Sequence, residues 1–394
     1  MLNVLDLFCG TGGFSYGLEA SGLGFKTRLG VDVLPIAGKT FQANHPQSLT
    51  FVGDIRKVRR AELADRMKLK RGDIHVIVGG PPCQGFSSIR PFRSSNDDDP
   101  RNSLFEEYAS FVNFFRPTIF VLENVVGLAT HRNGSTIETM EDCFSSLGYE
   151  TEWRILNAAH YGVPQKRERL IMLGAEKGMR LLFPDPSHSS SSSTIGYRDP
   201  SKLHRPEQPS LFAPVQPVLK PALSVMEAIS DLPPVSAGEE VLKYHSVPQN
   251  QYQTDRRNGS EVLTLHCATA HTRRMMEIIK HSGRNISSIP KHLITSGFSS
   301  CYSRLDADEP AVTITVNFVH PASNRCIHPV QDRALTPREG ARLQSFDDKF
   351  IFAGNRSQIA KQIGNAVPPL LGKSIANTLA EMLGVPGSVC QRAT

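Results

Sequence analysis

The chain has 394 residues, of which 39% are hydrophobic and 21% charged, and its formal net charge is +6 at pH 7. This describes an ordinary soluble globular protein, long enough for a catalytic domain and a smaller second domain. No run approaches 18 apolar residues, so we expect no transmembrane helix, and we expect no signal peptide either. Seven cysteines without a Cys-x-x-Cys pair predict neither disulfides nor a zinc site. We therefore expect no metal and a reducing, cytoplasmic compartment, and the mild charge permits a polyanionic partner.

A strand, a glycine-rich turn and a helix open the chain. Residues 3–7 predict the strand, residues 8–14 read Phe-Cys-Gly-Thr-Gly-Gly-Phe, and residues 15–21 predict an amphipathic helix. Such a turn lets a ligand approach the backbone and the free N–H groups of the helix. The turn is neither G-x-G-x-x-G nor a phosphate loop, so alone it is a weak sign of nucleotide binding.

Acidic residues follow the next two predicted strands. Asp32 lies near the end of the strand 27–33, about 20 residues after the glycines, where a carboxylate suits a ribose diol. A helix over 36–44 and a third strand precede Asp54, which suits an adenine amino group. Each residue could instead cap the element that follows it. Together they fit an adenosine-containing cofactor without a phosphate to bind.

The fourth predicted strand, 74–78, leads into the segment 79–87, Gly-Gly-Pro-Pro-Cys-Gln-Gly-Phe-Ser. This segment lies at the carboxyl edge of a parallel sheet, where α/β proteins bind ligands. Two prolines stiffen the approach to Cys83, which is placed like a nucleophile, although a small buried thiol is the simpler alternative. The polar stretch 87–101 reads as a lid or as a solvated loop.

A carboxylate and two arginines reach the same part of the predicted sheet. A helix over 104–115 and a strand over 118–122 lead to Glu123, followed by Asn124 and Val125. After a helix at 137–147 and a strand at 150–156, Arg167 and Arg169 precede the strand 170–174. If they lie on a strand, they share one face and suit a carbonyl or a phosphate. Ion pairs or solvated surface are the alternatives.

The pattern turns irregular after residue 183, with a serine run and five prolines between 206 and 221. We expect a catalytic domain over 1–183, a second domain over 184–332 with short strands such as 311–316, and a return to the first domain over 333–394. Thr336 predicts a capped helix with Pro337 and Glu339, and a last helix over 370–383 should pack against the first domain.

These segments, in this order, resemble the DNA (cytosine-5) methyltransferases. The match rests on residues 6–13 (Asp-Leu-Phe-Cys-Gly-Thr-Gly-Gly), 81–87, Glu123-Asn124-Val125, Gln165-x-Arg167-x-Arg169, 342–346 and 364–369. The family usually has alanine or serine at Cys9, aspartate at His160 and proline at Asp347. Cys9 is therefore expected to reshape the cofactor pocket slightly or to make it sensitive to oxidation.

The resemblance implies a Rossmann-like α/β S-adenosylmethionine-dependent methyltransferase domain with an irregular target recognition domain. It assigns the cofactor to Phe8, Gly10, Gly12, Asp32, Asp54, Ile55, Pro82, Leu104, Asn365 and Val367, and DNA to Ser87, Arg90, Arg93 and Gln165. Cys83 would add to carbon 6 of a flipped cytosine, and carbon 5 would take the methyl group, leaving S-adenosyl-L-homocysteine. A protonated Glu123 would donate a proton or a hydrogen bond to ring nitrogen 3 of the base. Arg167 would bind the exocyclic oxygen, with Arg169 in support.

Double-stranded DNA is the expected partner, in a bacterial or phage restriction-modification system with a cognate endonuclease. We expect a monomer on the nucleoid of the bacterial cytoplasm, without a membrane. An orphan epigenetic role fits the same residues. A tRNA cytosine-5 methyltransferase and an inactive DNA-binding protein of the same fold are the alternatives, and a flavin or nicotinamide enzyme would not explain Cys83 beside Glu123.

Overall fold

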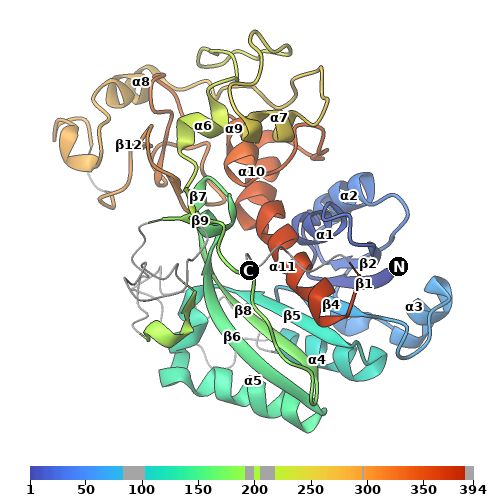
Figure 1. Cartoon of the computed structure of the whole chain (residues 1–394). Helices are drawn as coiled ribbons and strands as arrows, with labels where there is room; N and C mark the ends of the chain where they lie inside the picture. The colour runs from blue at the N-terminus through green and yellow to red at the C-terminus, as the bar shows by residue number, and fades with distance from the viewer. Residues whose placement is uncertain (83–102, 191–198, 205–217, 295–296, 387–394) are drawn as a thin grey trace. The chain divides into compact units, whose positions relative to one another are not determined.

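The computed structural model describes residues 1–82, 103–190, 199–204, 218–294 and 297–386. Two compact units are present (Figure 1). The first unit comprises Met1–Tyr161, Glu168–Lys220 and Pro369–Thr394, and the second comprises Gly162–Arg167 and Pro221–Pro368. No helix in the described ranges is both long enough and apolar enough to cross a membrane.

The first unit is built on an eight-stranded sheet in the order β10-β6-β8-β5-β4-β1-β2-β3. The strands are β1 (Leu2–Leu7), β2 (Phe25–Asp32), β3 (Leu49–Val52), β4 (Val76–Gly79), β5 (Ile119–Asn124), β6 (Tyr149–Asn157), β8 (Glu168–Glu176) and β10 (Leu203–His204). Strands β1 to β5 are parallel, and β8 runs antiparallel to both β5 and β6. The carboxyl ends of β1, β2, β4 and β5 therefore meet at one edge, as ligand sites of α/β proteins require.

Helices cover both faces of this sheet (Figure 1). One face packs on α3 (Arg60–Met67), α4 (Ser103–Phe115) and α5 (Ser135–Ser146) through a continuous apolar core. The other face carries α1 (Gly13–Glu19), α2 (Pro35–Asn44) and α11 (Pro369–Met382). The strands are apolar on both faces because both are covered, which is the pattern of a doubly wound sheet.

The last helix packs against α1, as predicted. A Cβ at Gly17 would lie 2.2 Å from the carbonyl oxygen of Pro369, so glycine permits the close approach of the two helices. Short elements complete the first unit: η1 (Ile55–Lys57), η2 (Val126–Gly134), η3 (Ala158–Tyr161), η4 (Pro200–Lys202) and β9 (His188–Ser189), with β11 (Lys220–Pro221) at its boundary.

The second unit has mostly short elements, as expected for the irregular region. They are β7 (Gln165–Lys166), α6 (Val225–Ile229), α7 (Gln251–Arg257), α8 (Arg273–Lys280), η5 (Ile286–Ser288), β12 (Ser303–Arg304), β13 (Ala311–Val312), β14 (Arg325–Ile327), α9 (Pro337–Leu343) and α10 (Arg356–Asn365). The predicted strand 311–316 is shorter than expected, because only two residues of β13 pair with β7. The capping box at Thr336 is present, since its side chain accepts from the Glu339 N–H and its own N–H donates to Glu339.

The unit boundary differs from the predicted domain boundary at residue 333. Helix α9 belongs to the second unit because its buried arginines pair with that unit's carboxylates. Arg342 contacts Asp348 at 2.6 Å and Asp231 at 3.1 Å, and Arg338 also reaches Asp348. Breaking a buried pair of this kind would leave an uncompensated buried charge. These ion pairs therefore hold α9 in the second unit. Only the segment from Pro369 onward joins the first unit.

Candidate active site

The conformation of the glycine-rich turn after β1 depends on left-handed backbone angles and on hydrogen bonds to one carboxylate. Phe8, Gly10 and Gly12 have φ values of 59°, 52° and 79°, in the left-handed region that favours glycine. Asp32, at the end of β2, accepts the Gly10 N–H at 2.9 Å and the Leu34 N–H at 2.8 Å. Burial raises the pKa of Asp32 above its ordinary value. Asp32 thus joins two strand ends, and each oxygen keeps a lone pair for a ligand hydroxyl.

The residues around this turn fit an adenosine-containing cofactor. A Cβ at Gly10 would meet open space, so a ligand can approach the backbone there. Among the described residues, Thr11 Oγ1 is buried without a hydrogen-bond partner. Val33 and Leu34 follow Asp32 and are 63% and 54% exposed, which gives an apolar surface beside the carboxylate. The sequence prediction missed this pair, although two apolar residues directly after a strand-end carboxylate were a usable signal.

The strand-end residues Asp54 and Ile55 lie after β3. Asp54 caps η1 by accepting the Arg56 N–H, and the Arg56 side chain binds the same carboxylate. These hydrogen bonds hold the pKa of Asp54 down at about 2. The capping alternative is therefore present in the structure, while Ile55 is buried. The carboxylate is charged and partly exposed, so it remains able to accept from a further donor.

Two more titratable groups, the Asp6 carboxyl group and the Cys9 thiol, are buried next to the turn. Asp6 is fully buried and accepts the Ser15 hydroxyl at 2.5 Å, and burial raises the pKa of Asp6 to about 7. Burial also raises the pKa of the Cys9 thiol well above its ordinary value. Since the thiolate is the form that oxidises readily, the expected oxidation sensitivity of Cys9 is not favoured by its surroundings.

The segment that leads to Cys83 is packed directly against β5. A Cβ at Gly79 would lie 2.5 Å from the Leu7 carbonyl oxygen, and one at Gly80 would lie 2.9 Å from Glu123 Oε2. The buried Asn124 side chain donates to the Pro81 carbonyl oxygen at 3.1 Å. Glycines and a side-chain hydrogen bond, in addition to the prolines, therefore fix this segment beside the Glu123 carboxylate.

Glu123 forms an ion pair with Arg169 at the start of β8. Arg169 Nε lies 2.8 Å from Glu123 Oε1, and the two side chains are 14% and 15% exposed. The pair is therefore largely shielded from water, and Arg169 fixes the orientation of the carboxyl group. Oxygen Oε1 is engaged by Arg169, and Oε2 is the atom that faces Gly80.

The structure gives the two predicted arginines different partners, and their predicted roles toward the base stay predictions. Arg167 is 1% exposed, and its terminal nitrogens donate to the carbonyl oxygens of Ile314 and Gly364. It lies between β7 and β8 instead of on a shared strand with Arg169, so the expected common face does not form. Arg169 is the arginine beside Glu123, and Arg167 holds the second unit together.

Gln165 is also a packing residue where it lies. It is fully buried, its amide nitrogen donates to Leu343 and Gln344, and its oxygen accepts the Ile314 N–H. Both ends of its amide are therefore engaged within the second unit, and its predicted role in DNA binding stays a prediction.

The other predicted site residues are distributed as follows. Pro82 is exposed and Leu104 is half-buried in the first unit. Asn365 is exposed and Val367 half-buried in the second unit. Cys83, Ser87, Arg90, Arg93 and the predicted lid lie outside the described residues.

The residues at which the chain departs from the family pattern are structural. His160 is buried, and its ring nitrogens contact the carbonyl oxygens of His204 and Ser190. Asp347 is buried and pairs with Arg256 at 2.8 Å. Neither side chain belongs to the arrangement around Glu123.

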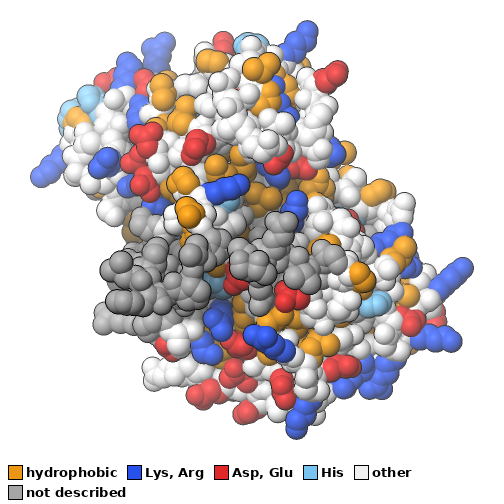
Figure 2. Space-filling view, viewed as in Figure 1, with side chains coloured by type: hydrophobic (Ala, Val, Ile, Leu, Met, Phe, Trp, Pro, Cys, Tyr) orange, Lys and Arg blue, Asp and Glu red, His pale blue; other side chains and the backbone are white. Residues whose placement is uncertain are grey.

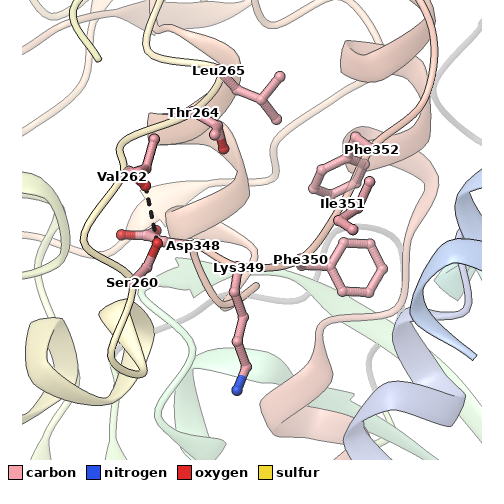
Figure 3. A pocket seen from close by; sticks show the side chains of 9 residues that line it. All are labelled: Ser260, Val262, Thr264, Leu265, Asp348, Lys349, Phe350, Ile351 and Phe352. Atoms are coloured by element: carbon pink, nitrogen blue, oxygen red, sulfur yellow. Dashed lines mark hydrogen bonds between the residues drawn. The ribbon is translucent and has the colours of Figure 1, made fainter. Parts of the chain in front are cut away.

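The second unit has a surface pocket whose lining residues do not include those around Glu123. It has a volume of about 290 Å³ and is lined by Ser260, Val262, Thr264, Leu265, Asp348, Lys349, Phe350, Ile351 and Phe352 (Figure 3). None of these residues was predicted to act in catalysis. On the face shown in Figure 2, basic and acidic side chains are interspersed, as the mild net charge predicts.

Comparison with known proteins gives a consistent result. The family model for C-5 cytosine-specific DNA methylase matches residues 2–381. The chain is 32% identical over 443 residues to Type II methyltransferase M.AgeI of Thalassovita gelatinovora, covering 96% of this chain and 99% of the relative. It is 34% identical to Type II methyltransferase M.DdeI of Desulfomicrobium norvegicum, covering 96% and 88%.

Solved structures share the fold over nearly the whole chain. A prophage-encoded protein of E. coli matches with a TM-score of 0.73 and 24% identity, covering 98% of this chain and all of the other. The S. pombe Dnmt2 methyltransferase matches with a TM-score of 0.58 and 16% identity, covering 98% and 99%.

Proposed function

The chain belongs to the C-5 cytosine-specific DNA methylase family, and on that premise we propose how its residues methylate a cytosine of DNA. S-adenosyl-L-methionine is the cofactor, and it supplies an electrophilic methyl group. The glycine turn, Asp32 and the apolar surface of Val33 and Leu34 bind its adenosine part. The main support for this proposal is the contact between the segment before Cys83 and the Glu123 carboxylate.

This contact supports a common site for the nucleophile and the carboxylate. Gly80 abuts Glu123 Oε2, and Cys83 follows three residues later, so the Cα atoms of Gly80 and Cys83 are at most about 11 Å apart. The target base must leave the duplex to reach them. The lid predicted after Cys83 would close over the extruded cytosine.

The Cys83 thiolate adds to carbon 6 of the cytosine, and the electron pair of the 5,6 double bond becomes available at carbon 5. Glu123 Oε2 carries the proton that ring nitrogen 3 receives, while Arg169 holds Oε1 and assists at the exocyclic oxygen. Carbon 5 then takes the methyl group. Loss of the carbon 5 proton to a base, with water as the simplest candidate, restores the double bond and expels the Cys83 thiolate, while the proton on ring nitrogen 3 returns to Glu123.

The names of the curated relatives support a finer proposal. We place the chain in a restriction-modification system of a bacterial cytoplasm, acting as a monomer on the nucleoid with a cognate endonuclease as its functional partner. Ser87, Arg90 and Arg93 would contact the DNA beside the flipped base. Asn365 and Val367 would complete the cofactor pocket together with Pro82 and Leu104.

The test is methyl transfer from labelled S-adenosyl-L-methionine to a mixture of unmethylated DNA and total RNA, followed by digestion to nucleosides. Label in 5-methyldeoxycytidine alone is expected, and the modified sites would give the recognition sequence. Label in 5-methylcytidine from RNA, or in neither nucleoside, would contradict the proposal.

A further inference from the structure

A histidine outside the predicted site lies directly beneath the glycine turn. His45 follows the end of α2, and its side chain has no exposed surface. Its ring stacks on Phe41 of the same helix, with ring centroids 4.5 Å apart. A Cβ at Gly12 would lie 2.6 Å from His45 Nε2, so Gly12 packs directly against the imidazole ring.

Both ring nitrogens of His45 face acceptors. Nδ1 lies 2.9 Å from Glu19 Oε2, and Nε2 lies 3.3 Å from the Gly12 carbonyl oxygen. A carbonyl oxygen only accepts, and so does an ionised carboxylate. With an Nε2–H that donates to the Gly12 carbonyl oxygen, and with Nδ1 at Glu19, His45 links α1 to the turn.

Glu19 is suited to hold the His45 ring in place. Its other oxygen accepts the Thr27 N–H at 2.9 Å. Burial by itself would raise the pKa of Glu19, but the hydrogen bonds and charge of His45, together with Thr27, lower it. Glu19 also lines an open pocket of about 500 Å³, so one end of the pair reaches solvent. Asp6 and Asp32 are the other carboxyl groups whose charges act in this cluster.

The Gly12 carbonyl is a sensitive point of the turn. It accepts the first hydrogen bond of α1, from the Tyr16 N–H at 2.8 Å, and Gly12 gives that helix no side-chain cap. The same residue has a φ of 79° and ends the loop whose Gly10 faces open space. A hydrogen bond from His45 Nε2 therefore fixes the Gly12 peptide, on which the shape of the cofactor loop depends.

We propose that His45 is a positioning residue for S-adenosyl-L-methionine, acting through its Nε2–H donor to the Gly12 carbonyl oxygen. This rests on the proposed cofactor site at the glycine turn. His45 touches neither the cofactor nor the base, so its loss changes cofactor affinity and leaves the methyl transfer step itself unchanged.

Two substitutions at one position separate this role from simple packing. In His45→Gln the amide nitrogen takes the place of Nε2 and keeps the donor to Gly12, whereas in His45→Asn it takes the place of Nδ1 and keeps only the contact to Glu19. Glu19→Gln lets a neutral His45 keep its Nε2–H while Nδ1 accepts from the new amide. His281→Asn, on the exposed end of α8, is the control.

Calorimetric titration with S-adenosyl-L-methionine and steady-state kinetics on DNA provide the readout. We expect His45→Asn to weaken cofactor binding about tenfold with kcat within twofold of wild type, the effect of one lost hydrogen bond. His45→Gln and Glu19→Gln should bind within threefold of wild type, and His281→Asn should be unchanged. If His45→Asn does not fold, a tenfold loss in His45→Gln would overturn the proposal and near-normal binding there would support it.

Equal affinities for His45→Gln and His45→Asn would overturn the role of His45 while leaving the cofactor site intact. A wild-type protein that binds no S-adenosyl-L-methionine would contradict the proposed cofactor site, and with it the inference that rests on it.

Discussion

Replacing Arg169 by methionine tests the role that the structure gives to this arginine. The substitution keeps much of the side-chain volume and removes the N–H that lies 2.8 Å from Glu123 Oε1. Glu123 would lose its charged partner in a position where only 15% of its side chain is exposed. The proposed reaction requires this carboxyl group to present Oε2 to the base, so its orientation should suffer.

The expected magnitude follows from the burial of the pair. A hydrogen bond to a charged group contributes about 1.5–3 kcal/mol, and loss of a fully buried partner costs about 3–5 kcal/mol. Because both groups keep some contact with water, we expect roughly 2–3 kcal/mol. At about 1.4 kcal/mol for each factor of ten, this is a 30- to 150-fold loss in kcat/KM.

The assay is methyl transfer to DNA, with cofactor affinity measured alongside. Cofactor affinity should stay within twofold of wild type, because Arg169 is assigned to the base. Arg154→Met is the matched control, since Arg154 pairs with Glu152 at 2.7 Å but both side chains are about one-third exposed. Exposed pairs contribute about 0–1 kcal/mol, so activity should hardly change. An Arg169→Met enzyme with more than a third of wild-type kcat/KM would refute the assigned role.

Four further substitutions test other parts of the account. Asp6→Asn removes a buried carboxyl group whose pKa is raised to about 7. As the pH rises from 4 to 7, the free energy of unfolding of the wild type should fall by up to about 4 kcal/mol relative to that of the variant. A difference between the two proteins that does not change with pH in urea titrations would contradict this. Gly17→Ala would place a Cβ 2.2 Å from the Pro369 carbonyl oxygen and should lower the free energy of unfolding by about 1–3 kcal/mol, whereas an unchanged Tm would be inconsistent with the packing of α1 on α11. Arg167→Met leaves two buried carbonyls without their donor and should lower Tm more than Arg169→Met does; the reverse order in thermal melts would argue against its structural role. Asn124→Ala should lower kcat at least fivefold with unchanged cofactor affinity, because the Pro81 carbonyl oxygen loses its hydrogen-bond donor. A wild-type rate would show that this hydrogen bond is not needed for catalysis.

Local features predicted well from the sequence. The capping box at Thr336 and the turn after β1 depend on residues close in the chain, and both are present. Parallel strands bring their carboxyl ends to one edge by topology alone, so Asp32, Glu123 and the segment before Cys83 could be placed together in advance.

Contacts between distant residues could not be predicted in this way. Arg167 and Arg169 look equivalent in the sequence, and only the tertiary structure shows that one binds backbone carbonyls and the other Glu123. The compact units divide the chain elsewhere than at the predicted domain boundary, because the buried pairs between α9 and Asp231 or Asp348 have no local pattern in the sequence. His45 likewise gives no signal in the sequence, since its partners Gly12 and Glu19 are 33 and 26 residues away.

The covalent bond between Cys83 and carbon 6 is the central claim, and it can be measured directly. DNA that carries 5-fluorocytosine at the target site should be incubated with the protein and S-adenosyl-L-methionine, and the digested complex analysed by mass spectrometry. Fluorine at carbon 5 cannot leave as a proton does, so elimination of the thiol is blocked and the adduct should accumulate on the peptide that contains Cys83. The account predicts this adduct in the wild type and its absence in Cys83→Ser. An adduct on another residue, or a Cys83→Ser protein that still methylates DNA, would contradict it.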